Sequence, residues 1–251
     1  MGLQRTRFVA IGDSFTEGLG DARADGSLRG WADLVAPEVA GEYANLAIRG
    51  KLLGAIIDEQ LEPALELEPD LVTFAGGGND VLRPRADLVT LRRLYDLTVA
   101  RLVDSGASVV LFTGADPSAN LPLGAVVRSH GDRYCDMIRE VAARRGALLV
   151  DLWAVDELRD LRFWAADHLH LNAAGHARVA GRELDVLDLP VPAGWTAPVP
   201  PVPPSAKPVR DQVHYYREFV GPWVQRRLTG RSSGDHRSPK IPAPVTPSLL
   251  G

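Results

Sequence analysis

A serine follows the first apolar run of the chain, in a setting that suits a nucleophile. Residues 7–11 form the run, and Gly12-Asp13-Ser14-Phe15 comes directly after it. We expect the run to be a buried strand and the stretch after it to be a helix. The hydroxyl of Ser14 would then lie at the open edge of a sheet, with its amide at a helix N-terminus. Ser14 could instead be a helix cap, because serine is a preferred capping residue and Glu17 follows three positions later.

A histidine and an aspartate further along the chain could activate this serine. A serine hydroxyl is a poor nucleophile until a base takes its proton, and the base needs a third group to fix its tautomer. Asp167 and His170 lie three positions apart, just before the last helical stretch. We expect the carboxylate to reach Nδ1 of His170, which leaves Nε2 to accept the proton of Ser14. His168 is interpreted as a loop residue. Asp167, His168 and His170 are not expected to hold a metal ion, because a stable site needs three or four ligands and clear partners that orient those ligands.

Attack on a carbonyl group also needs amide donors for the negative charge that develops on its oxygen. Three candidates follow predicted strands: the backbone N–H groups of Ser14 and Gly50 and the side-chain amide of Asn79. Arg49 and Arg83 flank two of these donors and are candidates for binding an anionic part of a substrate. Solvated surface arginines would give the same pattern.

The elements that must position these residues alternate along most of the chain. Strand-like runs lie at 8–11, 43–48, 71–74, 109–113 and 148–152, and helical patterns lie near 31–40, 52–67, 87–105, 124–145 and 173–186. Apolar strands that alternate with helices predict a parallel sheet covered on both faces. We therefore expect a three-layer α/β/α sandwich with a five-stranded, mostly parallel sheet. The loops after its strands meet at one edge, where the site is expected.

The composition changes at the end of this pattern, and we divide the chain there. Residues 1–187 form the predicted domain. Eight prolines between 190 and 208 exclude a regular helix, so 188–208 is predicted to be a linker or strap. Residues 209–230 form a predicted amphipathic helical segment that docks on the domain or contacts a partner or a second copy. Residues 231–251 are predicted to be a flexible tail.

Four blocks of sequence together resemble the SGNH hydrolases, also called the GDSL esterase/lipase family. They are Gly12-Asp13-Ser14-Phe15, with phenylalanine in place of the family's leucine, and residues 45–50, 77–80 and 167–170. Any one block alone is a weak signal, because Gly-Asp-Ser and Gly-Gly-Asn-Asp are also common turn sequences. Four blocks in the right order, each at the end of the proper element, are a specific signal. The resemblance covers residues 6–186 and implies a flavodoxin-like sandwich.

The resemblance also implies a mechanism. Ser14 attacks an ester, His170 acts as general base and then as general acid, and Asp167 orients the histidine. Ser14, Gly50 and Asn79 form the oxyanion hole. No metal or organic cofactor is implied.

Composition limits the partners and the compartment. The net charge of −4 does not favour nucleic acid or an anionic membrane. The N-terminus lacks the apolar segment of a signal peptide, no run of 18 apolar residues occurs, and Cys135 is the only cysteine. We therefore expect a cytoplasmic protein without membrane insertion.

Three functions remain open at this point. The first is a serine ester hydrolase that acts on a small or medium acyl ester, which includes carboxylesterases, carbohydrate deacetylases, lysophospholipases and thioesterases. The second is an acyltransferase that passes the same acyl group to a sugar or lipid acceptor. The third is a non-catalytic binding protein that acts through its C-terminal extension, although the presence of Ser14, Asp167 and His170 together argues against it.

Overall fold

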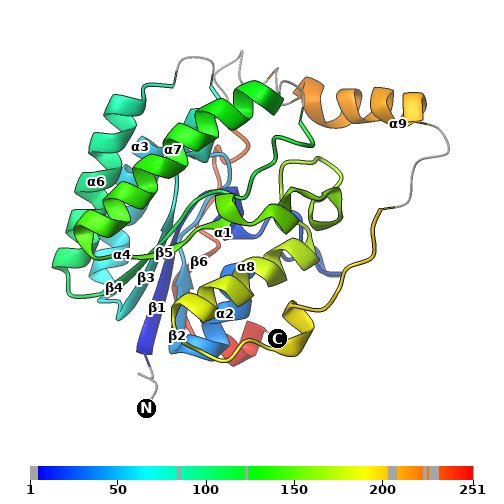
Figure 1. Ribbon diagram of the computed structural model, residues 1–251. Coiled ribbons are helices and arrows are strands. Elements are labelled where there is room, and N and C mark those ends of the chain that lie inside the picture. The colour runs from blue at the N-terminus through cyan, green and yellow to red at the C-terminus, as the bar shows by residue number, and fades with distance from the viewer. Residues whose placement is uncertain are drawn as a thin grey trace.

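A six-stranded sheet with the order β5-β4-β3-β1-β2-β6 forms the centre of the computed structural model (Figure 1). The structure describes residues 5–83, 86–121, 124–202, 208–222, 225 and 232–250. Its strands are β1 (Arg5–Gly12), β2 (Ala40–Asn45), β3 (Leu71–Ala75), β4 (Ser108–Phe112), β5 (Leu148–Val150) and β6 (Ile241–Val245). The first five strands are parallel, as expected, and β6 is antiparallel to β2.

Helices cover both faces of the sheet, which confirms the predicted layers. The helices are α1 (Ser14–Glu17), α2 (Trp31–Val39), α3 (Leu53–Ile56), α4 (Glu62–Glu66), α5 (Gly78–Val81), α6 (Leu88–Asp104), α7 (Gly124–Arg145), α8 (Ala173–Val186) and α9 (Pro208–Tyr215). π-helical turns lie at Ile57–Leu61 and Tyr216–Val220, and short 3-10 turns lie at Leu152–Ala154, Asp156–Arg159, Leu161–Phe163, Ala193–Trp195 and Pro247–Leu250.

The side chains of β1 show how the sequence builds this arrangement. Val9 and Ile11 point into a core formed with α3, α4, α6 and α7. Phe8 and Ala10 point into a second core formed with α2 and α8. Successive side chains of a strand alternate between the two faces, so a continuous apolar run such as β1 needs a cover on each side. No helix in the described part of the chain is long and apolar enough to cross a membrane.

The C-terminal part differs from the prediction. We expected five strands and a flexible tail at 231–251, but β6 pairs with β2 through Tyr43–Val245 and Asn45–Ile241. Pro242 and Pro244 lie in this strand, and proline is tolerated in an edge strand. The tail prediction is therefore wrong for the residues of β6, and the sheet has six strands.

The predicted strap and helical segment are described in part. Arg162 donates a hydrogen bond of 2.7 Å from Nη1 to the carbonyl oxygen of Val199, so the start of the strap lies on the domain. The predicted segment 209–230 contains α9 and the π-helical turn that follows it. Residues 203–207, 223–224 and 226–230 of these two predicted regions lie outside the described residues, as do residues 231 and 251 of the predicted tail.

His176 on α8 is fully buried and gives a prediction for stability. Its Nδ1 accepts a hydrogen bond from the N–H of Trp31 at 3.3 Å, and its Nε2 donates to the carbonyl oxygen of Leu19 at 3.0 Å. Burial lowers the pKa of His176 to about 4. The unfolded chain, with an ordinary histidine pKa of about 6.5, therefore takes up a proton first as the pH falls. This contribution to stability is complete above about pH 6.5 and is lost toward pH 4.

A His176→Gln substitution preserves one donor and one acceptor but removes the titration. We expect the stability advantage of the wild type over this variant to shrink by about 3 kcal/mol between pH 7 and pH 4. Denaturant unfolding at a series of pH values measures it, and His214→Gln, at an exposed histidine, is the control. A difference that stays constant with pH would contradict the prediction.

Candidate active site

Ser14 is the first residue of α1 and follows β1 after a single residue, Asp13. Asp13, and not Ser14, caps the helix, because its Oδ1 accepts a hydrogen bond from the N–H of Phe15 at 3.1 Å. The expected partner in a capping box, Glu17, binds Arg49 instead. The capping explanation for Ser14 is therefore wrong, and its hydroxyl is available for chemistry.

A buried glutamine fixes the turn that carries Ser14. Gln60 donates from Nε2 to the carbonyl oxygen of Gly12 at 2.9 Å, and its Oε1 accepts from the N–H of Gly12 at 2.8 Å. Gln60 is fully buried and lies in the first π-helical turn. At Gly12 the chain passes so close to β3 that a Cβ atom would lie 2.4 Å from the carbonyl oxygen of Ala75. The start of the turn is thus fixed by hydrogen bonds and by packing.

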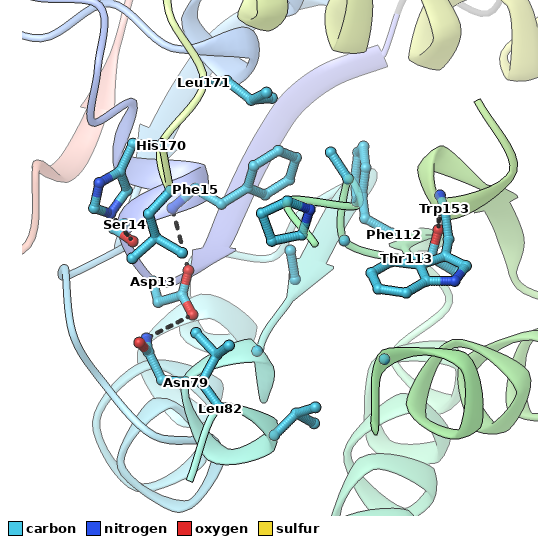
Figure 2. Close-up of a pocket in the computed structure, with 18 of the residues that line it drawn as sticks. Asp13, Ser14, Phe15, Asn79, Leu82, Phe112, Thr113, Trp153, His170 and Leu171 are labelled. Atoms are coloured by element: carbon cyan, nitrogen blue, oxygen red, sulfur yellow. Dashed lines mark hydrogen bonds between the residues drawn. The ribbon is translucent and has the colours of Figure 1, made fainter. Parts of the chain in front are cut away.

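Ser14, His170 and Asp167 form a continuous chain of hydrogen bonds. His170 Nε2 lies 3.1 Å from Ser14 Oγ, and Figure 2 shows the imidazole ring beside the serine. Nδ1 of the same ring lies 2.5 Å from Oδ2 of Asp167. The other oxygen of Asp167 accepts from the backbone N–H groups of Leu169 at 3.1 Å and His170 at 3.0 Å. This carboxylate therefore fixes both the backbone and the ring of His170.

The environment of Asp167 favours its ionised form. Burial acts to raise its pKa, but the hydrogen bonds and the charge of His170, together with the backbone N–H groups, outweigh burial and lower the pKa. An ionised Asp167 accepts a hydrogen bond from the N–H at Nδ1, so Nε2 is left without a proton and faces Ser14 as the acceptor. The expected geometry of these three residues is present.

The segment after the triad aspartate contacts the C-terminal part of the chain. The ring of His168 stacks on Tyr215 of α9 with centroids 4.5 Å apart. Tyr215 also donates from its hydroxyl to the carbonyl oxygen of Asp167 at 3.3 Å. His168 has a positive φ of 57°, a strained backbone that this stacking supports. Its side chain contacts no residue of the triad in the described interactions.

The three expected oxyanion donors lie around Ser14. Ser14 is the first residue of α1, so its N–H has no intrahelical acceptor. Asn79 on α5 donates from Nδ2 to Oδ2 of Asp13 at 3.0 Å and to the carbonyl oxygen of Lys51 at 3.1 Å. Gly50 has a φ of +73°, which favours glycine. Ser14, Gly50 and Asn79 all line one cleft.

Asp13 holds the side chain of Asn79 in this cleft. Burial raises the pKa of Asp13 to about 6, although the N–H of Phe15, the charge of His170 and the amide of Asn79 act in the opposite direction. Two groups thus accept from the Asn79 amide in the absence of substrate. A carbonyl oxygen bound there would share the donors now directed at Asp13 and Lys51.

The two arginines considered as substrate ligands have different surroundings. The guanidinium of Arg49 binds Glu17 through Nε at 2.9 Å and through Nη2 at 2.5 Å, and Oε2 of Glu17 also accepts from the N–H of Arg49 at 2.6 Å. This ion pair orders the loop before Gly50. A substrate role for Arg49 stays a prediction. Arg83 is exposed and lines the cleft. A substrate role for Arg83 stays a prediction.

Two cavities meet at Ser14, and they differ in chemistry. An apolar chamber of about 180 Å³ runs between the ends of β3 and β4 and α7, and its wall includes Phe15, Phe112, Val127, Cys135, Trp153 and Leu171 (Figure 2). A polar cleft of about 740 Å³ lies on the other side, and its wall includes Lys51, Asp58, Glu59, Arg83, Asp87 and Ser232. Ser14, Asn79 and His170 line both.

The chamber also contains the thiol of Cys135, which carries no evident chemistry. Burial raises its pKa to about 12, so it is a protonated thiol at neutral pH. Among the described residues, no three His, Cys, Asp or Glu side chains are grouped so that they could hold a metal ion.

The sequence profile of the GDSL-like Lipase/Acylhydrolase family matches residues 10–178 of the chain. This stretch is more than half of the sequence and includes Ser14, Asn79 and the segment with Asp167 and His170. The chain belongs to this GDSL family. As a GDSL hydrolase it is an enzyme that acts on ester bonds. The resemblance of the four sequence blocks is thereby confirmed.

Solved structures show the same fold as this GDSL hydrolase. LAE5, an alpha/beta hydrolase enzyme from the metagenome of Lake Arreo, Spain, is 25% identical with a TM-score of 0.57, over 73% of this chain and 95% of LAE5. TesA is 24% identical with a TM-score of 0.59, over 72% and 98%. The lipase/acylhydrolase from Enterococcus faecalis is 20% identical with a TM-score of 0.58, over 74% and 98%. No curated protein sequence matches the chain.

Sequence reasoning missed several residues around the site of this GDSL hydrolase. The turn before Ser14 is contacted by Gln60, the segment with Asp167 by Tyr215, and the loop with Gly50 by Ser232. No motif marks them. One signal in the sequence could have indicated Gln60: this polar residue lies on the apolar side of the predicted helix at 52–67, where a buried side chain is expected.

Proposed function

We propose that this GDSL hydrolase cleaves a carboxylic ester through an acyl-enzyme on Ser14. The observation that carries the proposal is the hydrogen-bonded chain from Ser14 Oγ through His170 to Asp167, placed where the two cavities meet. His170 Nε2 takes the hydroxyl proton as Ser14 Oγ attacks the carbonyl carbon. Asp167 stabilises the imidazolium that forms.

The negative charge moves to the carbonyl oxygen, which accepts from the N–H groups of Ser14 and Gly50 and from Asn79 Nδ2. Each such donor typically contributes about 10²- to 10³-fold in rate. The tetrahedral intermediate then collapses, the C–O bond to the alcohol breaks, and His170 gives its proton to the departing oxygen. A water molecule, deprotonated by the same histidine, attacks the acyl-enzyme and releases the acid and free Ser14.

The same residue types matter in a structural relative. Structures of catalytic mutants of Axe2, an acetylxylan esterase from Geobacillus stearothermophilus, carry alanine in place of a serine, an aspartate or a histidine. The aspartate and histidine changed there are three positions apart, like Asp167 and His170 here. This parallel supports the roles that we propose.

The two cavities differ in chemistry, and we assign the acyl group of the ester to one and the alcohol group to the other. The apolar chamber suits the acyl group, because it buries hydrocarbon away from water. The larger cleft, with several charged side chains in its wall, suits the alcohol. The chamber has a volume of about 180 Å³. An engineered apolar cavity of about 150 Å³ in another protein is large enough to bind benzene. We therefore propose a medium acyl group of roughly six carbons, and not acetyl alone.

A series of p-nitrophenyl esters from acetyl to palmitoyl tests the acyl assignment. We expect kcat/KM to be highest for acyl groups of roughly four to eight carbons. Val127 on α7 lines the chamber, so Val127→Phe is expected to move the optimum to shorter chains. Its neighbour Val126 is 51% exposed, and Val126→Phe is expected to leave the optimum unchanged.

Equal shifts in both valine variants would contradict the assignment of the chamber. Absence of hydrolysis across the whole series, in a folded protein that also fails to react with a fluorophosphonate, would contradict the proposed activity itself.

A further inference from the structure

The C-terminal segment at 232–235 forms a turn against the loop that carries Gly50. Ser232 donates from its hydroxyl to the carbonyl oxygen of Gly50 at 2.9 Å. The same hydroxyl accepts from the N–H of Gly234 at 3.1 Å, and the N–H of Ser232 donates to Oδ2 of Asp235 at 2.9 Å. The hydroxyl of Ser232 is therefore fixed in direction by its own turn before it meets the loop.

The two segments approach each other at the level of the backbone. A Cβ atom on Gly234 would lie 2.0 Å from the carbonyl oxygen of Arg49. A Cβ atom on Gly50 would lie 2.4 Å from Oγ of Ser232. Both positions need glycine for this close approach. The two glycines thus allow the backbones of the turn and the loop to pack directly against each other.

A partly buried lysine and a strand hold the C-terminal turn in place. Lys240 donates from Nζ to Oδ2 of Asp33 at 2.5 Å and to the carbonyl oxygen of Glu17 at 2.8 Å. Its side chain is only 14% exposed. The next residues form β6, which pairs with β2, the strand that leads into the loop with Gly50. The turn and the loop thus extend from neighbouring strands of one sheet.

The contacts fix the loop at successive backbone atoms. Glu17 accepts from the N–H of Arg49, Ser232 donates to the carbonyl oxygen of Gly50, and Asn79 donates to the carbonyl oxygen of Lys51. The N–H of Gly50 lies between these fixed points. Its direction decides whether it meets the oxyanion, because such donors must be aligned before the charge develops.

We propose that Ser232 is a positioning residue of the oxyanion hole and that the C-terminal turn 232–235 is a part of the active site. The inference rests on the proposed ester hydrolysis and deepens it. Ser232 acts through Gly50: its hydroxyl holds the glycine in the conformation that points the N–H toward the carbonyl oxygen. Ser232 and Ser233 also line the cleft that we assign to the alcohol.

The test compares three variants of the full-length protein. Ser232→Ala removes the hydroxyl, and Ser232→Thr restores one at the same position. Ser238→Ala makes the same change at an exposed serine that lies outside this turn, three residues after it. Each protein is assayed for kcat and KM on the best p-nitrophenyl ester and for inhibition by a trifluoromethyl ketone of matching acyl length, a mimic of the tetrahedral intermediate. A thermal melt of each verifies folding.

Ser232→Ala is expected to lower kcat about tenfold with KM unchanged, which is less than the loss of a whole donor. The inhibition constant for the ketone is expected to rise by the same factor, and Ser232→Thr and Ser238→Ala are expected to stay near the wild type. This match of kcat and ketone binding would not follow from a purely structural role.

Three results would overturn the inference: equal kinetics in Ser232→Ala and Ser238→Ala, a lower melting temperature with unchanged kcat, or a higher KM with unchanged kcat. A wild-type protein that neither hydrolyses esters nor reacts with a fluorophosphonate would instead overturn the proposed function, and the inference with it.

Discussion

Replacement of Ser14 by alanine is expected to lower ester turnover by about 10⁴-fold or more, while the melting temperature stays that of the wild type. The side chain is half-buried, and its described hydrogen bond is the one with His170. Asp13 caps α1, so the helix does not depend on the serine hydroxyl. The substitution therefore removes the nucleophile and little else.

Steady-state kinetics and reaction with a fluorophosphonate probe measure this effect. Ser129→Ala, at an exposed position of α7, serves as the matched control and is expected to keep full activity. Turnover by Ser14→Ala within tenfold of the wild type would exclude Ser14 as the nucleophile. An unfolded variant would show instead that the serine is needed for structure.

Asp167→Asn is expected to lower kcat by about 10⁴-fold with a small change in KM. The asparagine side chain can occupy the same space, but its amide is neutral and can present N–H to the ring of His170. The imidazole then loses the partner that fixes its tautomer, and the imidazolium is no longer stabilised. The low pKa of Asp167 means that the wild type already has the ionised carboxylate across the neutral range.

Asp156→Asn, at an exposed aspartate in a nearby 3-10 turn, is the control for this experiment. The two variants are compared by kcat and by near-UV circular dichroism, which reports the packing of the aromatic side chains, including Trp164 close to the loop. A decrease below tenfold in Asp167→Asn would show that His170 does not need the carboxylate, and the proposed triad would be wrong.

The sequence was sufficient to predict the parts of the site that are local. Ser14 and Asn79 each follow an apolar run within a few residues, and glycines mark the turns between strand and helix. Asp167 and His170 are three positions apart, so their contact lies within one loop. Such features can be seen because the residue and the element that positions it are neighbours in the chain.

The parts that could not be predicted depend on contacts between distant segments. Gln60 meets Gly12 across 48 positions, and Ser232 meets Gly50 across 182. Lys240 reaches Glu17 across 223 positions. Composition even pointed the wrong way at the C-terminus, since a proline-bearing, polar stretch is typical of a flexible tail but here supplies the sixth strand.

The placement of β6 has a consequence for the solubility of the protein. Without β6, strand β2 would expose a row of unpaired N–H and C=O groups, and such an edge can pair with a strand of another chain and cause aggregation. Ile241 and Val245 of β6 pair with Asn45 and Tyr43 of β2 and so cover this edge. Pro242 and Pro244 lie in β6, and neither has an N–H to offer to a further strand. The sheet therefore ends in a strand that pairs with β2 but offers few hydrogen-bond donors to a strand of another chain.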